Sequence, residues 1–118
     1  MKIVYASRTG NVESFVEKLG VEDTLKIETG NETVNEPYVL VTFTDGYGEV
    51  PEEVQDFLDN NAEHLVAVAA SGDTSYGEAY CLSADEIADT YGVPILAKFE
   101  FDGEPEDVEK FLNELNRL

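Results

Sequence analysis

Two hydroxyls, an amide and a glycine lie together near the N-terminus, in the segment Ser7–Asn11 (Ser-Arg-Thr-Gly-Asn). An apolar run over residues 3–6 precedes this segment, and a helix-period pattern follows it, with apolar positions at Val12, Phe15, Val16 and Leu19. Short donors, a backbone open to close approach and the positive end of a helix dipole suit a phosphate monoester. The same residue types also suit an ordinary helix N-cap, so the segment by itself leaves both interpretations open.

Strands and helices alternate around this segment. After the first strand, apolar runs predict strands at Thr24–Glu28, Tyr38–Phe43, Leu65–Ala70 and Ile95–Phe101. Amphipathic patterns predict four helices, whose apolar stripes run Val12–Leu19, Val54–Leu58, Ala84–Tyr91 and Val108–Leu115. Five strands alternating with four helices imply an α/β fold with a doubly wound parallel sheet. The short segment between the second and third strands lacks a helical pattern, which predicts an irregular crossover.

Ligands of such sheets bind at the carboxyl ends of the strands, where the strand order reverses. Three loops are expected at that edge, namely Ser7–Asn11, Thr44–Val50 and Ser71–Tyr80. The second loop places two glycines around Tyr47, and the third repeats that design around Tyr76. A phosphate cradle beside two glycine-rich loops, each with a tyrosine, predicts a site for a flat phosphorylated ring.

Length and composition narrow the class of protein. A chain of 118 residues predicts a single domain over residues 1–118, and 42% hydrophobic residues are typical of a folded one. No apolar run approaches the roughly 20 residues of a membrane span, and the sequence opens directly on a strand without a secretory signal. The lone cysteine, Cys81, excludes an internal disulfide and a cysteine-cluster metal site. These features favour a cytoplasmic protein.

The charge is strongly acidic, with 26 Asp and Glu residues against 7 Lys and Arg residues and a net charge of −19. Nucleic-acid binding and membrane-surface binding both need a basic footprint, which this sequence lacks. A like-charged surface for solubility and an acidic face that steers toward a basic partner explain the excess equally well. An anionic ligand stays compatible with this charge, because hydrogen bonds act at contact whereas exposed carboxylates beyond about 10 Å are screened.

Six short strings occur in order along the chain: Ser7–Val12, Val41–Thr44, Gly48–Pro51, Ala69–Gly72, Ser83–Asp85 and Val93–Glu100. With them the sequence resembles, over nearly its whole length, the flavodoxin-like NrdI family that serves class Ib ribonucleotide reductase. The resemblance implies a flavodoxin-like, five-stranded sheet with strand order 2-1-3-4-5. It also implies bound FMN that reduces dioxygen to a superoxide-level oxidant. The partner, the small subunit of the reductase, uses that oxidant to assemble a dimanganese–tyrosyl radical cofactor.

The resemblance also implies roles for individual residues. Ser7, Thr9, Gly10 and Asn11, with the amide of Val12, would hold the FMN phosphate. The loop Thr44–Gly48 would lie along the N5 edge of the flavin, where the Asp45–Gly46 peptide could turn its carbonyl toward the hydrogen of reduced N5. Tyr47 and Tyr76 are candidates for stacking on the ring, with ordinary surface aromatics as the alternative. The full expected cofactor-binding set is Ser7, Arg8, Thr9, Gly10, Asn11, Val12, Thr44, Asp45, Gly46, Tyr47, Gly48, Ser71, Gly72, Asp73, Tyr76 and Gly77, with the role of Arg8 open.

The flavin would carry the chemistry, so no catalytic side chain and no metal site are expected. His64 is interpreted as structural. Cys81 begins a helix, where the dipole can lower a thiol pKa, but a packed thiol is the favoured interpretation. The expected partners are the class Ib small subunit, dioxygen and an unidentified flavin-reducing protein, with no nucleic acid and no membrane.

Three other functions agree with these residues to different degrees. A general electron-transfer flavodoxin would keep all three loops and is the main alternative. A receiver domain needs acidic residues after the first and third strands, where this chain has Ser7, Arg8 and Thr44. The intact phosphate loop argues against an interaction module without a ligand.

Overall fold

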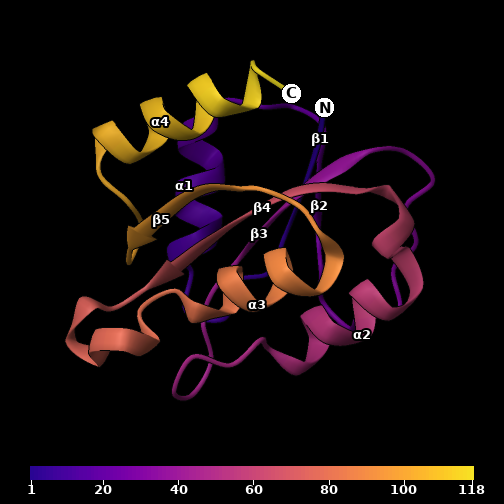
Figure 1. The fold of residues 1–118 in the computed structure, drawn as a ribbon. Helices are drawn as coiled ribbons and strands as arrows, with labels where there is room; N and C mark the ends of the chain where they lie inside the picture. Colours follow the sequence, from indigo (N-terminus) through magenta and orange to yellow (C-terminus); the bar gives the residue numbers. More distant parts are fainter.

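Five parallel strands form the centre of the molecule, in a computed structural model that describes residues 1–118 (Figure 1). They are β1 (Lys2–Tyr5), β2 (Thr24–Lys26), β3 (Tyr38–Thr42), β4 (Leu65–Gly72) and β5 (Ile95–Glu100). The sheet order is β2-β1-β3-β4-β5, and every neighbouring pair is parallel. This is the expected 2-1-3-4-5 order. The order reverses between β1 and β3, so the loops after these strands meet at one edge.

Two helices cover each face of the sheet (Figure 1). The helices α1 (Asn11–Leu19) and α4 (Pro105–Leu115) pack on one face. On the other face lie α2 (Glu52–Asn61) and α3 (Leu82–Tyr91). Two short 3₁₀ segments, η1 (Ala62–His64) and η2 (Thr74–Ala79), flank β4. None of these helices is long and apolar enough to cross a membrane.

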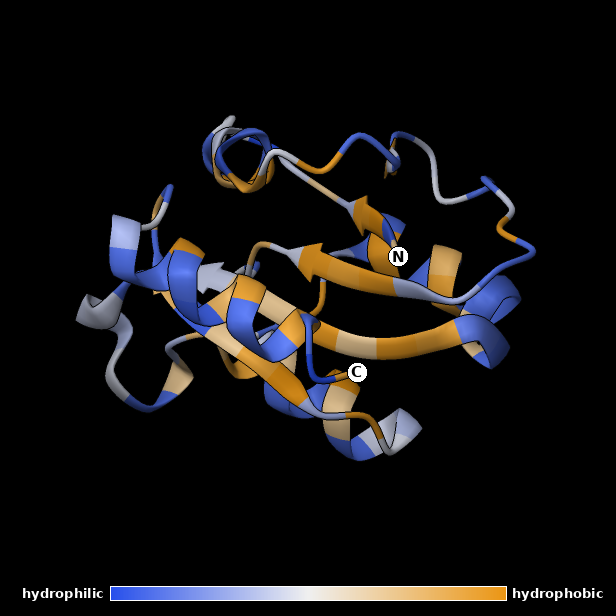
Figure 2. Ribbon diagram, turned by 90° about the horizontal axis from the view of Figure 1, so that it is seen from above, coloured by the Kyte–Doolittle hydropathy of each residue, from blue (hydrophilic) through white to orange (hydrophobic).

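The core has two halves because each strand offers side chains to both faces, and Figure 2 shows the strands as the most hydrophobic ribbons. Under α1 and α4, Phe15 stacks on Phe99 with ring centroids 3.8 Å apart, and Phe111 meets Phe15 edge-on at 5.7 Å. Under α2, Tyr38 meets Phe57 edge-on at 5.6 Å. Burying such a side chain contributes roughly 1.5–3 kcal/mol, so these aromatic groups hold the helices to the sheet.

The crossover from β2 to β3 has no helix, as expected, and polar side chains order it instead. The carboxylate of Glu32 accepts hydrogen bonds from the backbone N–H groups of Glu28, Thr29 and Gly30, at 2.9, 3.1 and 2.9 Å. Buried Asn61 at the end of α2 accepts from the Val34 N–H at 2.9 Å and donates to the Glu32 carbonyl at 2.9 Å. Two side chains thus supply the partners that a crossover helix would have supplied.

The structure differs from the sequence expectation most clearly at the end of β4. This strand runs two residues past Ala70, because Ser71 and Gly72 pair with Phe99 and Glu100 of β5. The expected third loop therefore begins as strand and continues as η2. The strand β2 is shorter than expected, because it has only three residues and ends at Lys26.

Candidate functional site

A cavity of about 300 Å³ opens at the carboxyl edge of the sheet, between the three expected loops. Most of the expected site residues line it, namely Arg8, Thr9, Asn11, Thr44, Asp45, Gly46, Ser71, Gly72, Asp73 and Tyr76. Six expected residues do not line it: Ser7, Gly10, Val12, Tyr47, Gly48 and Gly77. The topology therefore brings the three loops together around one hollow.

The first loop leads into the N-terminus of α1 through Gly10, whose φ of 92° is a left-handed conformation. The backbone N–H groups of residues 9–12 have no acceptor in the protein. The side chains of Thr9 and Asn11 line the cavity and form no hydrogen bonds, whereas Ser7 Oγ accepts the Glu13 N–H at 3.2 Å. Ser7 thus caps the helix and still has its own proton to donate. A run of free donors at a helix N-terminus fits a phosphate group.

The second loop is a narrow hairpin based on Asp45 and Glu49. The Asp45 N–H donates to the Glu49 carbonyl at 2.8 Å, and the Glu49 N–H donates to the Asp45 carbonyl at 2.7 Å. Its tip contains Gly46 and Gly48, which both have positive φ, of 47° and 95°. A Cβ on Gly48 would lie 2.8 Å from Leu82 Cδ2, so this position needs glycine for space as well as for conformation.

Thr44 connects the second loop to its neighbours. Its hydroxyl donates to the Ser71 carbonyl at 2.9 Å and lies 2.9 Å from Ser83 Oγ. Ser83 belongs to α3 and also approaches the Phe43 carbonyl at 3.4 Å. Although Thr44 lines the cavity, its hydroxyl is therefore engaged in joining β4, α3 and the second loop.

The third loop is anchored by carboxylates on both sides. Asp73 Oδ1 accepts the Ser75 N–H at 2.9 Å, and this backbone hydrogen bond, with a smaller contribution from the Ser75 hydroxyl, lowers the pKa of Asp73. Thr74 donates both its N–H and its hydroxyl to Glu100 Oε2, at 3.0 and 2.7 Å. The loop therefore sits on the end of β5, and Tyr76 is presented at the cavity.

Tyr47 and Tyr76 pack against each other and so join the second loop to the third. Their ring centroids are 6.0 Å apart with an interplanar angle of 75°, an edge-to-face pair. Their exposed fractions of 70% and 47% make them two of the most exposed large hydrophobic residues of the chain. Only Tyr76 lines the cavity, so stacking of Tyr47 on a bound ring stays a prediction.

Four residues of the cavity wall were not expected: Phe43, Ala79, Cys81 and Phe101. Phe101 follows β5 directly, at a left-handed φ of 52°, and its carbonyl accepts the Ser71 hydroxyl at 2.6 Å. Its place at the carboxyl end of a strand is a signal that the sequence does contain.

Cys81 lies in the cavity wall as a fully buried thiol. Its Sγ donates to the Ala70 carbonyl at 3.4 Å, and a Cβ on Gly72 would lie 2.9 Å from that sulfur. Burial raises the pKa of Cys81 to about 11, which outweighs any effect of the helix N-terminus. The favoured interpretation of a packed thiol is confirmed. His64 lies in η1, just before β4 begins, at the opposite edge of the sheet from the cavity.

Comparison with known proteins agrees with the family resemblance of the sequence. A family model described as "NrdI Flavodoxin like" matches residues 3–113. The chain is 47% identical over 111 residues to Protein NrdI of Macrococcus caseolyticus, which covers 94% of this chain and 85% of that protein. It is 45% identical over 118 residues to Protein NrdI of Bacillus licheniformis, with coverage of 100% and 89%.

The fold is also similar to that of a solved structure. A short-chain flavodoxin associated with a bacterial microcompartment superimposes with a TM-score of 0.73 and 28% identity, covering 98% of this chain and 95% of that one. The sequence match extends over nearly the whole chain, and the strand order and cavity agree with it. This chain belongs to the flavodoxin-like NrdI family.

Proposed function

We propose that the cavity binds FMN, and the observation that carries this proposal is the run of free backbone donors at residues 9–12. The family name NrdI implies an association with ribonucleotide reductase. The phosphate would accept hydrogen bonds from these N–H groups and from the side chains of Thr9, Asn11 and Ser7. The guanidinium of Arg8 is paired with Asp45, so the proposed cradle consists of uncharged donors.

The flavin ring would extend from the phosphate cradle into the cavity between the second and third loops. Tyr76 and Gly72 form part of the wall there. Bound FMN supplies the transfer of single electrons to dioxygen. The chain's own residues would orient the ring, offer peptide groups to its polar edge and contact it with aromatic side chains of the cavity wall.

The activity that follows is the reduction of dioxygen to a superoxide-level oxidant by this one domain, in the cytoplasm. The recipient would be the manganese-loaded small subunit of a class Ib ribonucleotide reductase, in which the oxidant assembles the dimanganese–tyrosyl radical cofactor. A separate flavin-reducing protein would recharge the flavin. The family membership of the chain supports this role, and the fold similarity to flavodoxins keeps general electron transfer as the alternative.

Flavin binding is tested by titration of the apoprotein with FMN and with riboflavin, followed by flavin fluorescence. We expect one-to-one binding of FMN and at least tenfold weaker binding of riboflavin, which lacks the phosphate. Equal affinities would contradict the assignment of residues 9–12 as a phosphate cradle.

The activity is tested by mixing the reduced holoprotein, its cognate manganese-loaded small subunit and oxygen, and recording the tyrosyl radical by electron paramagnetic resonance. We expect radical formation that depends on the reduced holoprotein. If no radical forms while the protein passes electrons efficiently to ordinary flavodoxin partners, the general-shuttle function is correct instead.

A further inference from the structure

Arg8 lies inside the phosphate loop but directs its charge to the second loop. Its Nη1 donates to Asp45 Oδ1 at 2.9 Å and its Nη2 to Asp45 Oδ2 at 3.2 Å, a bidentate pair. The guanidinium carbon lies 4.7 Å from the centroid of the Phe43 ring, and Nη2 is 3.7 Å from Glu53 Oε1. Arg8 therefore joins the first loop to Phe43 directly after β3, to the base of the second loop and to the first turn of α2.

The residue that Arg8 holds controls one particular peptide group. Asp45 Oδ1 accepts not only from Arg8 but also from the Gly46 N–H, at 2.9 Å. The carbonyl of Asp45 accepts the Glu49 N–H at 2.7 Å. Both polar groups of the Asp45–Gly46 peptide are thus occupied, and turning this peptide over would break two hydrogen bonds.

The next two peptides of the hairpin are different. The Gly46 carbonyl, the Tyr47 N–H and carbonyl and the Gly48 N–H form no hydrogen bonds within the protein. Gly46 and Gly48 flank them with positive φ, so a turn of either peptide meets little steric resistance. These two peptides are therefore freer to turn toward N5 than the Asp45–Gly46 peptide that the sequence suggests.

The geometry points to Arg8 as a positioning residue that clamps Asp45, so that the tip peptides from Gly46 to Gly48, and not the Asp45–Gly46 peptide, respond to the flavin. This inference rests on the proposed binding of FMN for its redox consequence, but the clamp itself exists without the flavin. Arg8 also balances the Asp45 carboxylate, which would otherwise add a negative charge beside the ring as the ring gains electrons.

The clamp is tested first in the apoprotein, by amide hydrogen exchange. In the wild type we expect the Gly46 and Glu49 amides to exchange more slowly than those of Tyr47 and Gly48. Arg8→Ala should speed exchange of Gly46 severalfold, and Arg8→Lys, which keeps the charge but loses the fork, should fall between them. Arg117→Ala removes the same charge from a surface ion pair with Glu114 near the C-terminus and should leave the Gly46 amide unchanged.

The consequence for the flavin is tested by potentiometry of the holoproteins. Arg8→Ala should reduce the affinity for reduced FMN relative to that for oxidised FMN at least threefold. This change appears as a lowered midpoint potential of the bound flavin. Arg117→Ala should leave the potential unchanged. Unchanged exchange at Gly46 in Arg8→Ala would overturn the clamp, and faster exchange with unchanged potentials would overturn its role toward the flavin. Failure of the wild type to bind FMN would instead overturn the proposed function, and with it that role, while faster exchange of the Gly46 amide in Arg8→Ala would still establish the clamp.

Discussion

Thr9 presents a hydroxyl that nothing in the protein satisfies, directly beside free backbone donors. A hydroxyl in this position is free to donate a hydrogen bond to a ligand or to water. The hydrogen bond is strongest when the acceptor is a charged ligand oxygen. Ser7 differs, because its oxygen already caps the Glu13 amide. The two hydroxyls of the same loop therefore differ: Thr9 is wholly free for the ligand, whereas Ser7 caps the helix with its oxygen and has only its proton left to donate to the ligand.

Replacing Thr9 with alanine should weaken FMN binding roughly tenfold or more, because one hydrogen bond to a charged oxygen contributes roughly 1.5–3 kcal/mol. Riboflavin binding should change little, since riboflavin has no phosphate to lose a donor. The measurement is the dissociation constant of each flavin by fluorescence titration.

Thr9→Ser is the matched control, because it keeps the hydroxyl and loses only a methyl group; it should retain most of the FMN affinity. An equal loss for FMN and riboflavin in Thr9→Ala would place Thr9 against the ring instead of the phosphate.

At the scale of elements, periodicity and turn residues in the sequence predict the strands and helices well. Buried runs such as Tyr38–Thr42 can be nothing but central strand, since all five residues are buried. The end of β4 could not be foreseen, because Ser71 and Gly72 are strand only through pairing with β5.

The candidate site likewise has features that the sequence predicts and features that it does not. The three loops follow from topology, and most of their expected residues line the cavity. The Arg8–Asp45 pair spans 37 positions of sequence, and the wall at Cys81 depends on a close approach to Gly72. Such contacts are long-range consequences of packing, for which a single sequence holds no local pattern.

The helix-free crossover provides a prediction at this scale, through Glu32. Burial by itself would raise the pKa of Glu32, but the backbone N–H groups that it accepts outweigh burial and lower that pKa. A carboxyl with a lowered folded-state pKa stabilises the fold above its unfolded pKa, near 4.3, and loses that contribution as pH falls through the folded value.

Glu32→Gln should therefore lower the free energy of unfolding by roughly 1 kcal/mol at neutral pH. The difference from the wild type should shrink below about pH 4.3 and vanish once the wild-type carboxyl is protonated. Urea unfolding across this pH range measures it. Glu109→Gln, which removes an outward-facing acid that accepts no hydrogen bond, controls for net charge. A difference that stays constant with pH would show that the carboxylate charge is irrelevant.

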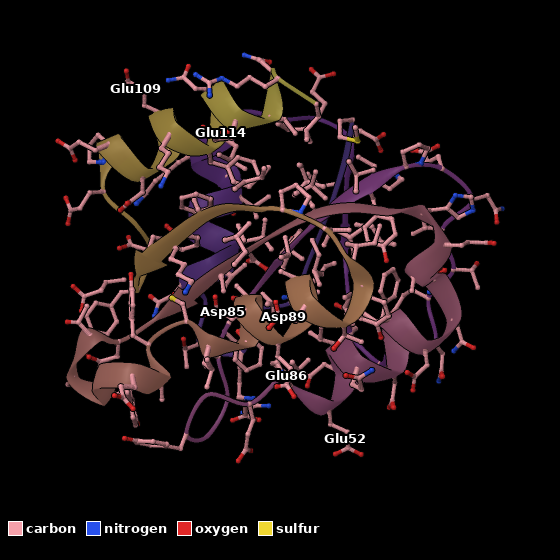
Figure 3. The ribbon with its side chains drawn as sticks, in the orientation of Figure 1. Glu52, Asp85, Glu86, Asp89, Glu109 and Glu114 are labelled. Atoms are coloured by element: carbon pink, nitrogen blue, oxygen red, sulfur yellow. The ribbon has the colours of Figure 1, made fainter.

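For the whole molecule, the dominant property is the net charge of −19. Every Lys and Arg except Lys110 lies within 4.0 Å of a carboxylate, so the few cations are locally paired. Several of the remaining acids extend outward from helices, as Figure 3 shows for Glu52 on α2, Glu86 and Asp89 on α3, and Glu109 on α4. Such a surface repels itself in the folded state and attracts basic surfaces of other proteins.

Salt screens both effects, so it should raise the stability of the fold but slow docking to a basic partner, which gives the last prediction. Raising NaCl from about 0.1 M to about 1 M shortens the screening length from roughly 10 Å to roughly 3 Å. Self-repulsion then weakens, so the urea midpoint of unfolding should rise, by a free energy on the order of 1 kcal/mol. Radical assembly in a partner small subunit should slow over the same range if the acidic helices steer the encounter. Glu86→Lys and Glu109→Lys together should reduce the stabilisation by salt. A midpoint that falls with salt would mean that the surface ion pairs outweigh the net repulsion.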